Sequence, residues 1–526
     1  MNPDPVNTEP PAAGQAATSN PDLGNLSATL RKGAVISAFV LVVVQVTSLL
    51  QTLVLARLLS PLEIGLFAAG TVLSNMLLTI SDGGLRGALI QRETDVEDAA
   101  ETVFWASLVT GTLMSLVMLA ASPVIALVFD SRVAGLIAAV TAGTMLLHSM
   151  TNVPDALMQR RFNFKRRLIV DPSVAITFAT VSVLLAVFGF GVWSLVAGSY
   201  ASLVVWIATT WLLAGWKPRR ARASVRMWRE LARFALPLVI EGIGDRARET
   251  IETVVVGRGL STTSLGHYRY GRRIAMIPGL AVVQVCSYVL FPAFSRIAGD
   301  PDRFRRAFLR ALGLIWFAAV PVAGLIIALG EPLAVMLLGE RWRAAGVVLV
   351  ALAGYGLGEA LNAVCGESLK GAGRPHLLNW LTAIGLVSLV GLLFALIPFG
   401  LVGVGLAISL SAVIVGVVNL ALARRVVGVP VGDVLARMVP PVVGSLVALA
   451  IVAPLEHLVL HSDLQGTGLA GVISGLGLLA AESVLFGLIY LVVLRVIAPA
   501  TVTELVSGIR RLFARRKRSE GESAPS

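Results

Sequence analysis

Residues 54–67 read VLARLLSPLEIGLF, and residues 255–268 read VVGRGLSTTSLGHY. The two stretches match at a constant offset of 201 residues. The matched pairs are Arg57 with Arg258, Leu59 with Leu260, Ser60 with Ser261, Gly65 with Gly266, and the aromatic pair Phe67 with Tyr268. Each stretch has the pattern of an apolar helix that ends, a short turn and a second helix that begins. The chain is therefore predicted to contain two copies of one helical unit.

The composition around these stretches is that of a membrane protein. Of the 526 residues, 56% are hydrophobic and 14% are charged, whereas soluble domains carry about 25% charged residues. Apolar runs of about 20 residues, long enough to span a bilayer as a helix, recur from one end of the chain to the other. The predicted fold class is an all-α polytopic membrane protein.

The two cysteines lie apart in apolar runs, and neither a zinc-ligand spacing nor a P-loop occurs, so no metal site and no ATP hydrolysis are expected.

A hydropathy scan with a window of about 19 residues predicts fourteen transmembrane helices. Their centres are Val44, Val72, Ser115, Thr141, Thr180, Val204, Asp245, Val285, Val322, Ala353, Leu386, Ser411, Leu446 and Val484. Because six spans separate the two copies, both copies enter the membrane in the same orientation. The prediction is two parallel six-helix lobes followed by two extra C-terminal helices.

The predicted division of the chain follows from these spans and from the distribution of charge. Residues 1–30 are predicted as a disordered cytoplasmic tail, 31–233 as the N-terminal lobe with spans 1–6, 234–435 as the C-terminal lobe with spans 7–12, 436–498 as spans 13 and 14, and 499–526 as a basic tail on the membrane surface. Lys and Arg gather in the loops after spans 4, 6 and 8, and the loops after spans 5, 11 and 13 contain none. The positive-inside rule therefore places both termini in the cytoplasm. The same rule accounts for the net charge of +12, so nucleic acid is not an expected partner.

One segment departs from this charge rule. The residues between spans 7 and 8 should face outward, yet they include Arg258, Arg269, Arg272 and Arg273. The offset of 201 aligns the last three with helix positions of the first copy, so they are predicted to lie inside span 8. A charged side chain at bilayer depth costs about 2.5 kcal/mol or more, so such a residue is expected to face water or a partner.

Span 7 carries a matching stripe of charge. Its charged residues are Glu241, Asp245, Arg246, Arg248, Glu249 and Glu252, and all except Arg246 share one helix face. Two interpretations are open. In the first, acids and arginines pair and lock spans 7 and 8 together. In the second, Arg246, Arg248, Arg269, Arg272 and Arg273 form a pocket for a phosphate or pyrophosphate, because guanidinium groups bind phosphate oxygens bidentately.

The acids of this region are the candidates for ion coupling. They are Glu241, Asp245, Glu249 and Glu252 of span 7, with Glu359 of span 10, which shares a helix face with Asn362. Such residues could tune the pocket or carry H⁺ or Na⁺. No other cofactor is expected.

Four blocks of the sequence resemble a known family. Residues 56–92 (ARLLSPLEIGLFAAGTVLSNMLLTISDGGLRGALIQR) resemble the opening signature of the polysaccharide transporter family, which includes O-antigen flippases. Residues 265–279, 291–312 and 369–375 resemble patterns of that family's second half. The family belongs to the multidrug/oligosaccharidyl-lipid/polysaccharide exporter superfamily. Relatives often have fewer basic residues in the stretch YRYGRR, which makes the pair Arg272 and Arg273 a departure from the family pattern.

The resemblance implies a function as well as a fold. It implies a plasma-membrane flippase with two lobes around a central cavity, which moves polyprenyl-(pyro)phosphate-linked oligosaccharides by alternating access, commonly coupled to an ion gradient. Membrane lipids, and polysaccharide polymerase or assembly proteins, are then the expected partners. Three alternatives stay open: a lipid II-type flippase, because that branch also has fourteen spans, a cation-coupled multidrug exporter of the same fold, and an enzyme of polysaccharide synthesis. An enzyme is the least expected, because every predicted outward loop is short.

Overall fold

The computed structural model describes residues 21–82, 84–160, 164–218, 223–462 and 468–499, and every element in these ranges is a helix. In hydrocarbon each backbone polar group must be satisfied within the protein, and an apolar segment achieves this as a helix. The first half comprises α1 (Pro21–Leu58), α2 (Pro61–Asp82), α3 (Leu85–Gln91), α4 (Val96–Val128), α5 (Arg132–Thr141), α6 (Gly143–Ser149), α7 (Asn152–Arg160), α8 (Phe164–Val187) and α9 (Trp193–Ala214).

The second half comprises α10 (Val225–Gly259), α11 (Thr262–Arg296), α12 (Pro301–Leu338), η2 (Glu340–Trp342), α13 (Arg343–Ala351), α14 (Ala353–Gly371), α15 (Leu377–Leu396), η3 (Ile397–Phe399), α16 (Gly400–Val427), α17 (Val431–Leu455), η4 (Glu456–Leu460) and α18 (Leu469–Ile497). The centre of each of the fourteen predicted spans lies on one of these helices.

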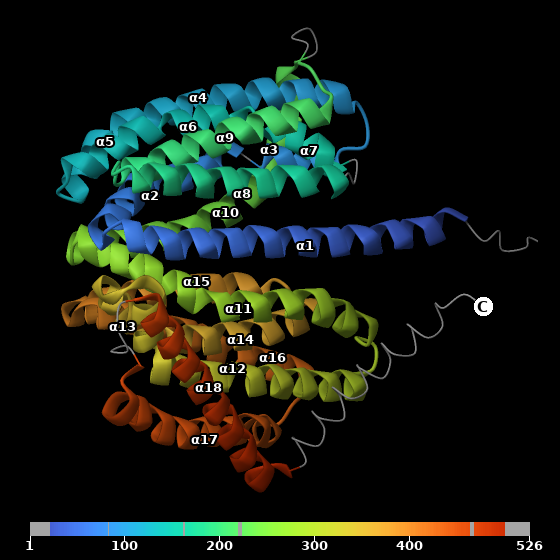
Figure 1. Ribbon diagram of the computed structural model, residues 1–526. Coiled ribbons are helices and arrows are strands. Elements are labelled where there is room, and N and C mark those ends of the chain that lie inside the picture. Colours follow the sequence, from blue (N-terminus) through green and yellow to red (C-terminus); the bar gives the residue numbers. More distant parts are fainter. Residues whose placement is uncertain (1–20, 83, 161–163, 219–222, 463–467, 500–526) are drawn as a thin grey trace, which may run out of the picture.

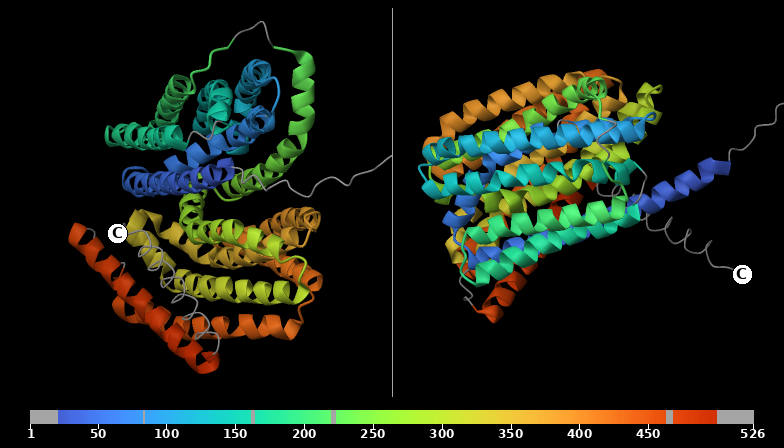
Figure 2. Two further views of the ribbon diagram at one scale, coloured as in Figure 1. Left: turned by 90° about the vertical axis from the view of Figure 1, so that its right-hand side faces the viewer. Right: turned by 90° about the horizontal axis from the view of Figure 1, so that it is seen from above.

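The helices form two groups, which Figure 1 shows one above the other. In the first group α2 packs on α4 and α5, and α8 packs on α1 and α9. In the second group α14 packs on α11 and α16, and α17 packs on α12 and α18. The helix α10 contacts α2 and α4 of the first group and α11 and α15 of the second, and Figure 2 shows it as a long curved helix between them. Any side chain on the inner face of α10 therefore lies where the two groups meet.

The repeated stretches have the same local structure, as predicted. The first helix ends at Leu58 in one copy and at Gly259 in the other, and the second helix begins at Pro61 and at Thr262, so both boundaries keep the offset of 201. The three arginines of the second copy that follow the turn lie inside α11, as the alignment predicted.

A serine directly precedes the second helix in each copy and caps its first turn. The hydroxyl of Ser60 accepts a hydrogen bond from the backbone N–H of Glu63, at 3.3 Å. The hydroxyl of Ser261 accepts one from the backbone N–H of Ser264, at 3.0 Å. A serine in this place satisfies one of the backbone donors that the first turn of a helix leaves free.

The two copies touch each other at Gly65 of α2 and Gly266 of α11. A Cβ atom on Gly65 would lie 1.7 Å from the carbonyl oxygen of Thr262, and a Cβ atom on Gly266 would lie 1.8 Å from that of Pro61. Only glycine permits two helix backbones to approach so closely. The contact is reciprocal between matched residues, which is the pattern that a two-fold axis between the copies produces.

Two helices begin earlier in the chain than predicted. The helix α1 begins at Pro21, so residues 21–30, predicted as disordered, are helical; proline is favourable at the first helical position, and each added residue gains a hydrogen bond. The helix α10 begins at Val225, so the basic residues Arg226, Arg229 and Arg233 lie in a helix and not in a loop. Residues 1–20 and 500–526, which include nearly all of the predicted basic tail, lie outside the described residues.

The described residues contain eleven segments that are long and apolar enough to cross a membrane. One of them, Leu377–Val427, contains two long helices, α15 with 20 residues and α16 with 28. The charged helix α10 and its partner α11 are not among the eleven. The class of polytopic α-helical membrane protein is confirmed, and the number of fourteen spans stays a prediction.

Candidate functional site

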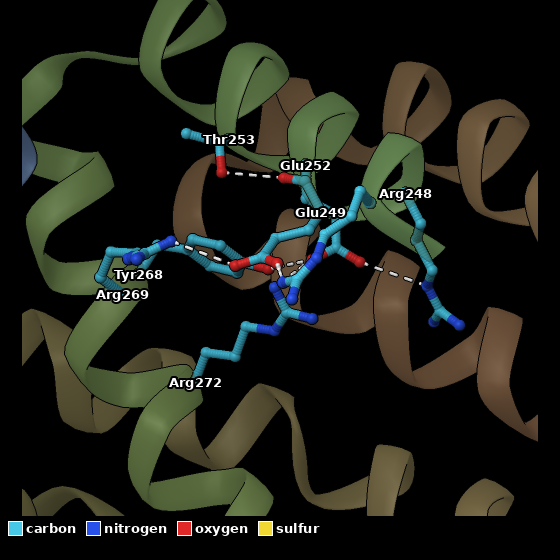
Figure 3. Close-up of polar contacts among 8 residues, drawn as sticks. Arg248, Glu249, Glu252, Thr253, Tyr268, Arg269 and Arg272 are labelled. Carbon is cyan, nitrogen blue, oxygen red and sulfur yellow. Dashed lines mark hydrogen bonds and ion pairs between the residues drawn. The ribbon is translucent and has the colours of Figure 1, made fainter. Parts of the chain in front are cut away.

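Glu252 of α10 lies at the centre of a buried polar cluster. Its side chain is fully buried. Tyr268 of α11 donates a hydrogen bond to Glu252 Oε2 at 2.7 Å, and Arg272 Nη1 lies 2.6 Å from the same oxygen. Arg248 Nε lies 3.4 Å from Glu252 Oε1, and Figure 3 shows its guanidinium group directed away from the other side chains. A buried carboxylate is tolerated when donors surround it in this way.

Glu249, one turn away on α10, forms a second and looser group. Arg246 Nη1 lies 3.1 Å from Glu249 Oε2, and Arg269 Nη1 lies 3.4 Å from Glu249 Oε1. The side chain of Glu249 is 30% exposed and that of Arg246 is 49% exposed. Ion pairs with this exposure and these distances contribute little to stability, so an incoming anion could replace the Glu249 carboxylate on either arginine.

A cavity of about 450 Å³ adjoins both groups. It is lined by Thr79 of α2, by Gly242, Arg246, Arg248 and Glu249 of α10, and by Arg272 of α11. Its wall thus carries three guanidinium groups and one carboxylate. A concave site with an excess of positive charge concentrates anions, and both helix groups contribute to it.

A second cavity, of about 390 Å³, is also lined by Arg248. Its lining includes Glu359 and Asn362 of α14, with further residues of α15 and α16. Glu359 is hydrogen-bonded to Asn362 and lies within electrostatic range of Arg248. Arg248 therefore lines both cavities, and a change of charge at Glu359 in the second cavity would be felt by Arg248 in the first.

The structure brings together six of the ten residues predicted from the sequence. They are Arg246, Arg248, Glu249, Glu252, Arg269 and Arg272. Glu359 lies in the neighbouring cavity. Glu241 and Asp245 belong to α10, but their side chains lie outside the described residues.

Arg273 lies apart from Arg272, although both belong to the arginine pocket predicted from the sequence. Its Nη2 donates a hydrogen bond to the backbone oxygen of Ser48 in α1 at 3.1 Å and also contacts the Ser48 hydroxyl. One residue turns an α-helix by about 100°, so Arg272 and Arg273 leave α11 in different directions. Arg272 points to Glu252, and Arg273 points to the first helix group.

Sequence reasoning missed three polar residues of the site. Thr79 lines the larger cavity, and Asn75, one turn earlier on α2, lines a small recess with Arg246, Glu249 and Arg269. Their spacing of four residues in an apolar helix was the available signal. Tyr268 was noted only as an aromatic match in the repeat, and no sequence pattern joins it to Glu252, sixteen residues away.

Both interpretations of the charged helices find support in this geometry. The pairs around Glu252 lock α10 to α11, as the first interpretation predicts. The cavity beside them has the positive wall that the second requires. The described residues hold no group of three or more His, Cys, Asp and Glu side chains that could bind a metal ion.

The chain is similar in sequence and in fold to known proteins. The sequence profile of the family described as "Polysaccharide biosynthesis protein" matches residues 54–346. The succinoglycan biosynthesis transport protein ExoT of Rhizobium meliloti is 28% identical over 341 residues, which cover 64% of this chain and 68% of that protein. The lipopolysaccharide biosynthesis protein WzxC of Escherichia coli is 24% identical over 348 residues, 65% of this chain and 70% of that protein. Among solved structures, the lipid II flippase MurJ in an inward closed conformation has a TM-score of 0.68 at 14% identity, over 88% of this chain and 98% of MurJ.

Proposed function

The chain belongs to the family of polysaccharide biosynthesis proteins, and from this membership we propose that it moves a lipid-linked saccharide across a membrane. The observation that carries the proposal is the cationic cavity between the two helix groups. Relatives named for succinoglycan transport and for lipopolysaccharide biosynthesis support a saccharide cargo destined for the cell surface. The likeness to MurJ supports the fold that such transport would use.

The cargo would be held by its anionic link between lipid and sugar. Polyprenyl phosphate or pyrophosphate presents oxygens that guanidinium groups bind in pairs. Arg248 is the first candidate, because it is 32% exposed and lines both cavities. Arg246 and Arg269 would follow, once the phosphate replaces Glu249. The sugars would occupy the cavity, and the apolar tail would remain in the lipid.

Glu359 is the proposed site of ion coupling. It lies beside Asn362 in the second cavity and within electrostatic range of Arg248. A proton or Na⁺ at Glu359 would change the charge that Arg248 experiences and hence its affinity for the phosphate. Transport would then respond to the ion gradient. Loss of that response in Glu359→Gln, with transport down the cargo gradient intact, is the expected result.

The proposed setting is the plasma membrane, with both termini in the cytoplasm and polymerase or assembly proteins as partners. A lipid II-type cargo is the alternative that the positive cavity also fits. A cation-coupled multidrug exporter is less well supported, because its cavity would be lined by acidic and aromatic residues, whereas three arginines line the larger cavity. Catalysis is not proposed, since the names of the relatives describe transport and biosynthesis roles without a reaction.

The test is a lipid extract from cells that lack the protein. We expect a complete saccharide repeat unit to accumulate on its polyprenyl carrier, facing the cytoplasm, while surface polysaccharide falls. Wild-type protein and the variant Arg341→Ala, which removes an exposed arginine away from the cavities, should restore both. Arg248→Ala should restore neither. No accumulation, with unchanged surface polysaccharide, would contradict the proposal.

A further inference from the structure

An apolar groove of about 310 Å³ lies on the outside of the first helix group, beside the start of α10. One wall is α4, with Trp105 and Val109, and the other is the first turn of α10, with Val225 and Trp228. Val225 is 72% exposed, Val109 is 68% exposed and Trp228 is 44% exposed. The groove shares no lining residue with the cationic cavity, so it is a separate site.

The groove is preformed. The backbone N–H of Ser224, just before α10, donates a hydrogen bond to the hydroxyl of Thr102 on α4, at 3.2 Å. Behind the groove Phe104 contacts Trp105 edge to face, with 5.3 Å between ring centroids. Phe104 also packs against Trp211 and Trp216 of the buried core. A rigid apolar groove binds an apolar chain without first having to order its own side chains.

The surroundings of the groove are basic. Arg226 and Arg229 directly follow the lining residues Val225 and Trp228 in the chain, and both are exposed, as is Lys217. The acidic neighbour Glu230 is paired with Arg92 at 3.2 Å, and Glu97 and Asp98 at the start of α4 also have partners. An apolar groove with a cationic rim suits a ligand with an apolar chain and an anionic head.

We propose that this groove is a binding site for an anionic phospholipid. One acyl chain would lie along Val109 and Val225, and the phosphate would meet Arg226 and Arg229. A membrane protein has such lipids beside it at all times, tryptophans gather at the membrane–water interface, and basic pockets beside transmembrane helices bind anionic head groups. The bound lipid would attach the start of α10 to the membrane. This helix also carries Arg246 and Arg248 of the candidate site.

The test uses the quenching of tryptophan fluorescence by brominated lipids. The full chain, with its nine tryptophans, is reconstituted in phosphatidylcholine vesicles that contain increasing amounts of brominated phosphatidylglycerol or brominated phosphatidylcholine. Trp228→Phe removes one reporter of the groove and keeps an aromatic ring. Arg226→Gln with Arg229→Gln removes the rim charge, and Arg424→Gln with Arg425→Gln, at the end of α16, makes the same change of charge elsewhere.

The expected result is a saturable excess of quenching by the brominated anionic lipid over the neutral one. Trp228→Phe should reduce this excess. Loss of the two rim arginines should raise the lipid fraction at half-saturation by roughly tenfold or more, and the α16 pair should leave it unchanged. Equal quenching by both lipids would overturn the proposal, and so would an excess that Trp228→Phe leaves undiminished or a half-saturation fraction that the rim variant leaves unchanged. Because the measurement does not involve transport, it stands or falls separately from the proposed function.

Discussion

Glu252 holds α10 and α11 together through contacts that water cannot replace. Its carboxylate is fully buried and receives a hydrogen bond from Tyr268 and an ion pair from Arg272. Arg272 also lies over the Tyr268 ring, 5.9 Å from its centroid, a cation–π arrangement that adds to the pairing. If one partner is removed, a buried charge is left uncompensated. The free-energy cost of that charge is much larger than the stabilisation that the intact pair provides.

Arg272→Ala should therefore destabilise the protein by about 3 kcal/mol. Arg246→Ala removes the ion pair of half-exposed Arg246 with Glu249 and should cost less than about 1 kcal/mol. Thermal or denaturant unfolding of the two variants in detergent checks this difference. Equal stability of both variants would contradict the role given to Glu252. It also follows that lost transport in an Arg272→Ala/Arg273→Ala double variant would not by itself identify a phosphate site.

Arg248→Ala is the sharper test of anion binding. Its distance of 3.4 Å to Glu252 is long for an ion pair, and Tyr268 and Arg272 remain to satisfy that carboxylate. We expect transport to fall by about tenfold or more, the value of one charged hydrogen bond, with little change in unfolding temperature. Arg248→Lys should recover part of the rate, because it keeps the charge without the planar fork. Full transport by Arg248→Ala would exclude this residue from the phosphate site.

The arginines of the site could be predicted from the sequence because charge is rare in apolar helices. The side chain that each arginine contacts could not be predicted. Arg273 is adjacent to Arg272 in the chain, yet it contacts Ser48 on α1. This contact depends on where α1 packs against α11, which the sequence does not show. Asn75 and Thr79 are ordinary polar residues in α2 until α10 is placed against them.

At the scale of elements, the contact between α2 and α11 joins the two helix groups. Gly65 and Gly266 allow the helix backbones to touch, and each Cβ position is blocked by a carbonyl oxygen of the opposite helix. Backbone atoms cannot move aside as a side chain can. Any larger residue must separate α2 from α11.

Gly65→Ala and Gly266→Ala should each lower the unfolding temperature, and by similar amounts because their surroundings are reciprocal. Gly391→Ala is the matched control, since nothing lies within 4 Å of a Cβ atom at that position of α15. It should be neutral or stabilising, because alanine favours helix over glycine by about 1 kcal/mol. A Gly266→Ala variant as stable as Gly391→Ala would contradict the close contact.

The turns of the repeat and their constant offset could be predicted, but the first residues of α1 and α10 could not. The repeated turns carry local signals, a serine cap and a glycine, which act over a few residues. The N-terminal extensions of α1 and α10 are polar, and a hydropathy window measures apolar content rather than helix continuity. A helix that continues out of the apolar layer is therefore cut short by such a scan.

At the scale of the whole molecule, the proposal requires the turn between α10 and α11 to face the outside and the start of α12 to face the cytoplasm. Single cysteines test this, because both native cysteines, Cys286 and Cys365, are buried. In intact cells a membrane-impermeant maleimide should label Thr263→Cys, and should label Arg303→Cys only after permeabilisation. The reverse pattern would overturn the orientation and, with it, the direction of transport.

The most direct test of the central claim is transport in proteoliposomes by the purified chain. A fluorescent polyprenyl-pyrophosphate oligosaccharide is placed in both leaflets, and the fraction bleached by an impermeant reductant is followed over time. We predict that wild-type protein and Arg341→Ala raise this fraction from about half, the share of one leaflet, towards completion, and that Arg248→Ala raises it about tenfold more slowly or less. A wild-type protein that bleaches no more than empty liposomes, or an Arg248→Ala variant that matches wild type, would contradict a flippase with a cationic cavity as its binding site.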